Sequence, residues 1–261
     1  MKTTVSDRLY LTGLTDEQSD QIKQTLTFRN PKYDEALQFG RSTWAIPASL
    51  GLFEDTCEGL AIPRGRPLDW LKDCDIQDDR NSHPVQIETS IESQPYQERV
   101  IQLAIDNGGG VIIAPAGAVK TTIGIELSAR LGERCLILVK SLDPAKQWQT
   151  AIKRFTGLDC GLIGGGKCQE GEAFTVGLTP ALVKHKGSLD YGLVIVDDCH
   201  NIPAAQAYIV INRQKAKYRF GLSATLQCRG NLEFMVHAAL GPVIAEVKAD
   251  EVGAHFQESE V

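Results

Sequence analysis

The stretch that decides the fold is Gly110-Val-Ile-Ile-Ala-Pro-Ala-Gly-Ala-Val-Lys-Thr-Thr122. Its apolar residues Val111 to Ile113 predict a buried strand, and the small residues Ala114 to Ala118 predict a tight turn. Lys120-Thr121-Thr122 then opens a helix. This is the layout of a phosphate-binding loop, in which backbone N–H groups at a helix N-terminus cradle phosphate, a lysine reaches the outer phosphates and the next hydroxyl holds Mg²⁺.

Two positions of this loop depart from the usual pattern. Val119 stands directly before the lysine, where glycine is usual, and Ala114 stands at the position of the first glycine. We expect the β-branched Val119 to cost roughly 1–3 kcal/mol and to weaken ATP binding about fivefold to a hundredfold. Taken alone, the stretch is weak evidence, and an ordinary strand–turn–helix corner remains the alternative.

Composition sets broad limits on the class of protein. The 261 residues suffice for one large domain or two small ones, and the hydrophobic share of 43% is that of a globular protein. The net charge of −6 argues against a protein that is basic throughout and binds nucleic acid by its total charge. A local basic groove remains compatible with this charge.

Cysteine usage and the absence of targeting signals favour a cytoplasmic protein. No two cysteines have the C-x-x-C spacing, so we expect reduced thiols. The first residues lack the apolar core of a signal peptide, and no apolar run approaches the length of a membrane span. The seven cysteines are Cys57, Cys74, Cys135, Cys160, Cys168, Cys199 and Cys228.

Periodicity and composition divide the chain into four parts. We expect a small α/β N-terminal module over residues 1–71 and a polar, charge-rich linker over 72–93. Strands alternate with helical patterns over 94–246, which predicts an α/β domain with a mainly parallel sheet. Residues 247–261 are expected to form a polar tail.

Within the module, the sequence predicts short elements joined by turns. Thr15 begins a capping box for a helix. The basic residues Arg41, Arg64 and Arg66 lie on predicted turns, where contact with phosphates and simple solvation are equally open. The other predicted elements are strands over Arg8 to Thr12, Trp44 to Leu52 and Leu60 to Ile62, and helices over Lys32 to Phe39 and through Trp70 and Leu71.

A second polar cluster follows another apolar run, Leu193-Val-Ile-Val-Asp-Asp-Cys-His200. The run predicts a buried strand, and its carboxylates emerge at the carboxyl end, where α/β sheets bind ligands. Asp197 would hold Mg²⁺ together with the hydroxyl of Thr121, and Asp198 would orient the attacking water. The alternative is that the two aspartates merely end a strand and start a turn.

A third polar cluster, Ser223-Ala-Thr225, follows the predicted strand Tyr218 to Leu222. In a parallel sheet the carboxyl ends of the strands meet at one edge, so Lys120, Asp197 and Ser223 should lie along one crevice. Three polar clusters at one edge favour a nucleotide site over a chance arrangement of turns.

These motifs in this order resemble the first motor domain of superfamily 2 DNA helicases, in the branch of the UvsW and XPB-like enzymes. The resemblance covers residues 91 to 245 and implies a RecA-like P-loop fold for this part. Gln94-Pro-Tyr-Gln97 is similar to the adenine-reading signature, Ala114 to Thr121 to Walker A, and Asp197-Asp-Cys-His200 to the DExH box. Further matches are Leu138-Val-Lys140 with Gln147-Trp148 to motif Ia, Thr175 to Leu182 to the next DNA-contacting segment, Phe220-Gly-Leu-Ser-Ala-Thr225 to motif III, and Ala239-Leu-Gly-Pro-Val243 to the domain's end.

The resemblance implies ATP and Mg²⁺ as cofactors and DNA as a partner. Asp198 and Lys120 would be catalytic, and Thr121 and Asp197 would hold the metal. His200, Ser223 and Thr225 would couple the nucleotide site to DNA, and Lys140 and Ser141 would contact DNA. Nucleotide binding would involve Tyr96, Gln97, Gly117, Ala118, Val119, Lys120, Thr121 and Thr122.

Several positions depart from the family pattern. Asp198 stands where the family has glutamate, and a water misplaced by ~1 Å can cost ~10²-fold in rate. Gln94 replaces an arginine, and Leu226 replaces the proline that follows motif III. A second motor domain, whose arginines can supply ~10³–10⁵ in rate, is also expected and would come in trans or from a C-terminal part.

Three functions remain open at this point. The first is a helicase or translocase motor half whose turnover needs a second motor domain. The second is a degenerate, non-catalytic module that binds DNA or protein, which Val119, Asp198 and the pI of 5.4 favour. The third is the motor of a restriction or phage-defence complex, which shares the fold.

Overall fold

The computed structural model describes residues 1–65, 74–115, 117–187, 189–202, 205–228, 232–248 and 250–252. The expected helix through Trp70 and Leu71, the basic residue Arg66 and most of the expected tail lie outside this range.

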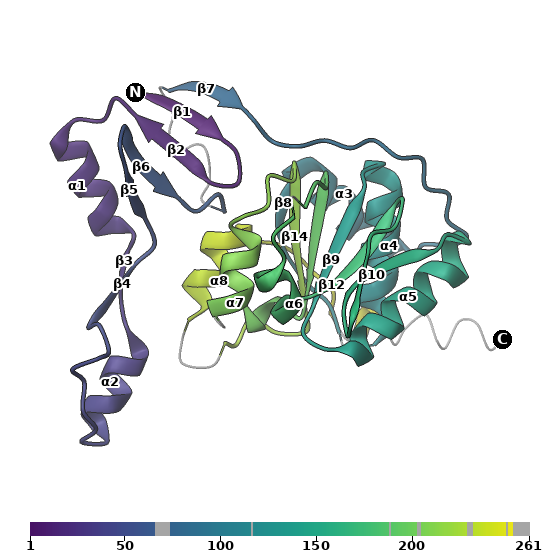
Figure 1. The fold of residues 1–261 in the computed structure, drawn as a ribbon. Helices are drawn as coiled ribbons and strands as arrows, with labels where there is room; N and C mark the ends of the chain where they lie inside the picture. The colour runs from purple at the N-terminus through teal and green to yellow at the C-terminus, as the bar shows by residue number, and fades with distance from the viewer. Residues whose placement is uncertain are drawn as a thin grey trace.

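The larger of the two main sheets has eight strands in the order β11-β10-β12-β9-β13-β14-β8-β15 (Figure 1). All neighbours pair in parallel except the hairpin β10–β11, so the predicted mainly parallel sheet is confirmed. Strand β9 is buried along its whole length, which explains its unbroken apolar sequence. The strands are β8 (Gly109–Ile113), β9 (Cys135–Val139), β10 (Cys160–Gly164), β11 (Lys167–Gln169), β12 (Phe174–Leu178), β13 (Leu193–Asp197), β14 (Tyr218–Ser223) and β15 (Val243–Glu246).

Helices cover both faces of this sheet. Side chains of α3, α4 and α5 form one core with one face, and those of α6, α7 and α8 form a second core with the other (Figure 1). A parallel sheet needs both covers because its strands are apolar on both faces. The helices are α3 (Pro95–Asn107), α4 (Ala118–Leu131), α5 (Leu142–Thr156), α6 (Thr179–Lys184), α7 (Ala205–Ile211) and α8 (Glu233–Leu240), with a 3₁₀ turn η2 (Cys199–Asn201).

The N-terminal module has its own sheet, ordered β5-β6-β2-β1-β7, with helix α1 packed on it. Strand β7 pairs in parallel with β1, although it lies in the expected linker. The polar residues of this segment form an exposed edge strand because the free edge of β1 offers backbone hydrogen-bond partners. The elements are β1 (Lys2–Val5), β2 (Leu9–Thr12), α1 (Asp16–Thr25), β5 (Glu54–Thr56), β6 (Gly59–Ile62) and β7 (Asp75–Asp78).

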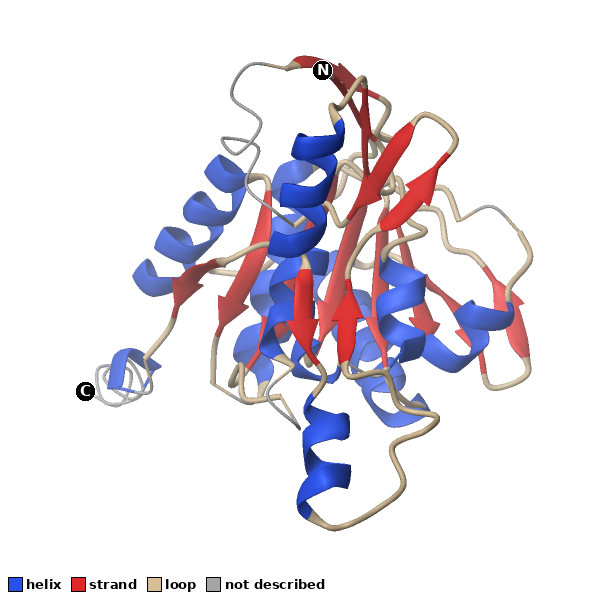
Figure 2. Ribbon diagram, turned by 90° about the vertical axis from the view of Figure 1, so that its left-hand side faces the viewer, coloured by secondary structure: helices blue, strands red, loops and turns tan. Residues whose placement is uncertain are grey.

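A two-stranded ribbon, β3 (Thr27–Arg29) with β4 (Ser49–Gly51), carries helix α2 (Pro31–Gln38) away from the module's sheet, as Figure 1 and Figure 2 show. The predicted strand over Trp44 to Leu52 is wrong except at β4, because Pro47 cannot donate to a ladder and Trp44 is 91% exposed in a turn. The capping box at Thr15 is confirmed, since its side chain accepts from Gln18 N.

Arg64 joins the module to the motor sheet. Its guanidinium donates to the carbonyl oxygens of Ser6, Ala216 and Lys217, at 2.8, 2.6 and 3.1 Å. Arg64 is therefore partly buried and held by backbone carbonyls rather than simply solvated, and its contact with a phosphate stays a prediction. No helix in the described part of the chain is long and apolar enough to cross a membrane.

Candidate nucleotide site

The three predicted clusters lie at adjacent strand ends. In the parallel ladders Ser223 of β14 pairs with Ile113 of β8, and Asp197 of β13 pairs with Leu222 of β14. The carboxyl ends of β8, β14 and β13 therefore stand side by side, with the loop of Lys120 following β8 directly. The expected convergence on one sheet edge is confirmed.

The loop after β8 enters helix α4 at Ala118. Gly117 has a left-handed φ of +113°, a conformation that glycine adopts without steric cost. Val119 lies inside the first turn of α4, where its side chain is half-buried and packs against the core. Its backbone is helical, so its φ angle shows no strain.

Lys120 reaches across the loop to both aspartates. Its Nζ lies 2.5 Å from Asp198 Oδ1 and 3.9 Å from Asp197 Oδ1. The side chains of Lys120 and Asp197 are only 10% and 16% exposed, so their charges interact in a poorly solvated place, whereas that of Asp198 is 46% exposed. This arrangement presents one cation between two carboxylates, which suits a ligand made of phosphates and a divalent metal.

Asp197, at the end of strand β13, is held in place by a residue of helix α5. Trp148 on α5 donates from Nε1 to Asp197 Oδ2 at 2.9 Å. Burial raises the pKa of Asp197, and the charge of Asp198 adds to the rise, while the Trp148 bond and Lys120 oppose it. The hydrogen bond from Trp148 to Asp197 was not predicted from the sequence. It could have been suspected, because an indole N–H needs a hydrogen-bond partner when the ring is buried.

Asp198 has the only positive φ, 48°, of any non-glycine among the described residues. Its backbone N–H donates to Asp197 Oδ1 at 3.0 Å, and its side chain is 46% exposed. A strained backbone at a ligand-binding edge is a common feature of functional sites. The turn directs one carboxylate inward to Trp148 and leaves the other at the surface beside Lys120.

His200 connects two of the strand ends. Its Nδ1 lies 2.8 Å from Ser223 Oγ, and its Nε2 lies 3.1 Å from Asn201 Nδ2. Ser223 is fully buried and donates to the Thr225 carbonyl at 2.5 Å. Thr225 itself is exposed, and its Oγ1 accepts from the backbone of Gln227. A chain of hydrogen bonds thus runs from η2 to the segment after β14.

Gln97 touches the loop helix. Its Nε2 donates to Thr122 Oγ1 at 3.0 Å, and its Oε1 accepts from Gln94 N at 2.8 Å. Thr122 also donates to the Val119 carbonyl, while Tyr96 is half-buried against the core. The structure therefore brings the expected adenine-reading residue to the start of α4, with its amide engaged by the protein.

The remaining predicted residues occupy the same edge. Thr121 is half-buried in the first turn of α4, one residue after Lys120. Lys140 and Ser141 are exposed at the carboxyl end of β9, the strand beside β13. Their exposure suits contact with a large ligand such as a nucleic-acid backbone.

The residues present fit a magnesium ion that is held chiefly by a nucleotide. Within the described ranges, no group of three or more His, Cys, Asp and Glu side chains could hold a metal. Mg²⁺ usually takes only one or two carboxylates from the protein and the rest of its ligands from phosphates and water. Asp197 and the hydroxyl of Thr121 are donors of the required kind.

Comparisons with known proteins find a matching family and several relatives. The model of the family described as type III restriction enzyme, res subunit, matches residues 90–228. A putative DNA 3′-5′ helicase Rad25 of Haloarcula marismortui is 29% identical over 184 residues, which cover 65% of this chain and 29% of the relative. The DNA 3′-5′ helicase XPB of Mycobacterium tuberculosis is 32% identical over 181 residues, covering 63% of this chain and 32% of the relative.

A solved structure extends the likeness to the N-terminal module. The crystal structure of the UvsW helicase from bacteriophage T4 superposes with a TM-score of 0.69 at 16% identity, covering 94% of this chain and all of that chain. At this identity the match shows the fold alone. The chain spans about a third of the length of the curated relatives that it matches.

Proposed function

The chain belongs to the family described as type III restriction enzyme, res subunit, and on this premise we propose that it is part of an ATP-dependent DNA helicase or translocase. The family match and the curated helicase relatives agree with the resemblance of residues 91 to 245 to the first motor domain of superfamily 2 helicases, in the UvsW and XPB-like branch. The observation that carries the proposal is the meeting of Lys120 with Asp197 and Asp198 at one sheet edge.

Each residue of the site has a proposed role in binding ATP. The backbone from Gly117 to Val119 and the Lys120 ammonium would hold the phosphates, with Thr122 nearby. Asp197 and Thr121 would hold Mg²⁺, which neutralises phosphate charge when bound. Asp198 would orient the attacking water, and Gln97 with Tyr96 would contact the base.

We further propose DNA as the second ligand. Supporting it, the relatives are named as DNA helicases or translocases. Lys140 and Ser141 are exposed one strand away from Asp197, where they would contact phosphates of the strand. The His200–Ser223 hydrogen bond would transmit the state of the nucleotide site to Thr225 and the DNA side.

Turnover is proposed to need a second motor domain, in trans or from a C-terminal part. The relatives' greater length supports this, because arginines of a second domain complete such sites. We retain the division into a module (1–71), a connecting segment (72–93), a motor domain (94–246) and a tail (247–261), although the connecting segment contains strand β7.

A second candidate function is a non-catalytic module that binds DNA or protein. Val119 favours it, because its β-branched side chain stands directly before Lys120, where the loop usually has glycine and lets phosphate approach the backbone. Asp198 in place of glutamate favours it as well. In this case the motor fold would serve as a scaffold alone.

A titration of Mg²⁺·ATP separates these two functions. Loss of a charge-assisted hydrogen bond in Lys120→Ala should weaken binding about 10- to 100-fold. Lys153→Ala is the matched control, since Lys153 lies on α5 and pairs with the exposed Asp159 on the loop that follows. A natural chain that binds no ATP, with strong binding in Val119→Gly, would indicate a decayed site.

Turnover itself is tested by adding a second motor domain from a relative together with DNA. We expect DNA-stimulated ATP hydrolysis only when both halves are present and Lys120 is intact. If hydrolysis stays at baseline with the second half and DNA added, the motor-half proposal fails.

A further inference from the structure

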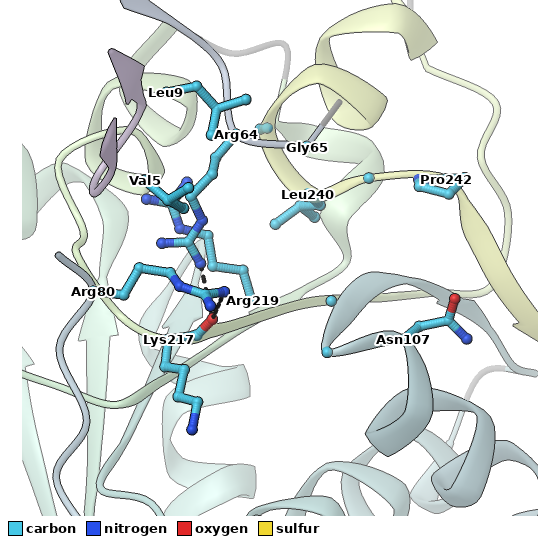
Figure 3. Close-up of a pocket in the computed structure, with 14 residues that line it drawn as sticks. Val5, Leu9, Arg64, Gly65, Arg80, Asn107, Lys217, Arg219, Leu240 and Pro242 are labelled. Atoms are coloured by element: carbon cyan, nitrogen blue, oxygen red, sulfur yellow. Dashed lines mark hydrogen bonds between the residues drawn. The ribbon is translucent and has the colours of Figure 1, made fainter. Parts of the chain in front are cut away.

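A cavity of about 350 Å³ lies at the opposite edge of the sheet, between the N-terminal module and the motor domain (Figure 3). The module contributes Val5 and Leu9, and the motor domain contributes the backbone that joins α3 to β8 and the residues Leu240 and Pro242. The volume falls in the range of roughly 300–1,000 Å³ typical of small-ligand pockets. We call this space the seam cavity.

Three guanidinium groups gather on one wall of the seam cavity. Figure 3 shows Arg64, Arg80 and Arg219 pointing toward one another from three different segments. Arg64 and Arg80 both donate to the Lys217 carbonyl, at 3.1 and 3.3 Å. Carbonyl oxygens carry only partial charge, so they do not neutralise three cations.

Arg219 is the least satisfied of the three. It is 2% exposed, and its Nη2 donates to the carbonyls of Asp7 and Gln214. Its Nε and Nη1 are buried without a hydrogen-bond partner among the described residues. Two unpartnered donors on a buried cation are costly, which calls for an explanation.

The carboxylates that act on these three arginines, Asp7 and Asp78, carry less charge than the arginines do. Asp78 is already held by Arg80 through contacts of 2.7 and 2.6 Å, and Asp7 accepts from Tyr10. Burial lowers the pKa of Arg219 to about 9, and the charge of Arg80 adds to this, against the attraction of Asp7. The free cluster therefore carries more positive charge than its surroundings balance.

We propose that the seam cavity is a binding site for a phosphate group, held by Arg64, Arg80 and Arg219. Guanidinium forks match the oxygens of a phosphate with two donors each, and a phosphate offers enough oxygens for the free donors of Arg219. A terminal phosphate with two negative charges balances the cluster better than a carboxylate does, whereas a phosphodiester brings one charge and relies on its oxygens as acceptors. The ligand is either a small phosphate compound or a phosphate of a nucleic-acid chain.

A purely mechanical role explains part of the cluster and no more. Arg64 by itself is such a clamp, since its hydrogen bonds to the carbonyls of Ser6 and Ala216 join the module to the motor domain. Among the described residues, Arg219 hydrogen-bonds to the module through the Asp7 carbonyl, which occupies one of its three nitrogens. A clamp needs no unpartnered donors in a cavity, whereas an anion site does.

The test is a titration with inorganic pyrophosphate in a Lys120→Ala background, which removes the nucleotide site as a competing phosphate binder. We expect saturable binding that weakens at least about tenfold in Arg219→Met and in Arg80→Gln. Arg41→Gln, an exposed arginine elsewhere in the module, should leave affinity unchanged within about twofold. If Arg219→Met fails to fold, Arg80→Gln decides the matter alone, because Arg80 is partly exposed.

A second arm identifies the source of the phosphate. An oligonucleotide with a 5′-hydroxyl offers phosphodiesters only. If Arg80→Gln weakens its binding and pyrophosphate competes with it, the site takes nucleic-acid phosphates; if only pyrophosphate responds, it takes a small phosphate compound. Pyrophosphate that fails to bind, or that binds all variants equally, overturns the proposal. ATP binding that depends on Lys120 is measured separately, so each site can fail without the other.

Discussion

Strand β14 ends in two different electrostatic environments. At its carboxyl end, beside Ser223, one lysine stands between two aspartates. Near its amino end, Arg219 and two further arginines outnumber the carboxylates that act on them. A set with one carboxylate more than its cation suits a ligand that brings both a metal ion and phosphate, while an excess of cations suits phosphate alone.

The two ends also differ in which part of the chain builds them. The carboxyl edge is made by the motor sheet and its own helices, whereas the amino edge is closed by the module through Asp7 and Arg64. Changes at one edge should therefore leave the other edge unaffected, since sites far apart act independently. The predictions below test that separation.

The largest effect is expected from Trp148→Ala. The ring is fully buried and packs against Gly124, where an added Cβ would lie 2.7 Å from the ring. Removing it should lower the free energy of unfolding by about 3–5 kcal/mol, measured in denaturant. Trp44→Ala, which removes a ring that is 91% exposed, should change it by less than about 0.5 kcal/mol. Equal effects of the two changes would contradict the placement of Trp148 in the core.

The next effect concerns the metal. Asp197→Asn removes the proposed Mg²⁺ ligand while keeping its shape, so Mg²⁺·ATP should bind about 10- to 100-fold more weakly in calorimetry. Binding of ATP in EDTA should change little. Asp159→Asn, an exposed carboxylate on the loop after α5, is the control. If pyrophosphate binding at the seam cavity also fell, the two edges would not be independent.

A pH dependence follows from Asp197. Because burial raises its pKa, the proton stays on this carboxylate up to a higher pH than on an ordinary aspartate. Mg²⁺ competes with that proton, so the Mg²⁺-dependent part of ATP binding should decline on acidification sooner than for an exposed aspartate. Trp148→Phe removes the indole N–H that opposes the rise, and should move the decline to still higher pH. ATP titrations between about pH 5 and pH 8 at fixed Mg²⁺ measure this decline in the natural protein and in Trp148→Phe. Identical pH profiles for these two proteins would exclude the role of Trp148.

The smallest effect is predicted for Asp78→Asn. This change removes the carboxylate that holds Arg80 and leaves the seam cavity more positive. Pyrophosphate should bind about two- to fivefold more tightly in the Lys120→Ala background, since a partly exposed charge is screened by solvent. Asp34→Asn, which touches the exposed Arg29, should have no effect. Weaker binding in Asp78→Asn would argue against a phosphate at this edge.

Local sequence predicted an element well where the residues of that element alone determine its structure. The capping box at Thr15 and the buried strands β8 and β13 follow from residues within a few positions of each other. Local sequence was a poor guide where a segment forms its hydrogen bonds with a strand that is distant in the sequence. Strand β7 is polar and exists because β1 lies beside it, and the predicted strand beginning at Trp44 is mostly a turn.

The candidate nucleotide site could be foreseen in its membership but not in its contacts. Parallel strands bring their carboxyl ends together, so Lys120, Asp197 and Ser223 followed from the order of motifs. The pairing of Lys120 with Asp198 depends on the left-handed turn at Asp198, which no periodicity encodes. Val119 lies in a helical turn with its side chain against the core, and its predicted cost to ATP binding stays a prediction.

What the sequence by itself determined is the fold class, the family resemblance and one edge of the sheet, because apolar periodicity and motif order are local properties of the chain. Only the tertiary structure decided how charges meet. It placed Trp148 against Asp197, and it brought Arg64, Arg80 and Arg219 into one cavity from segments up to 155 positions apart (219 − 64). Such contacts depend on three-dimensional packing, which the spacing of residues along a chain does not record.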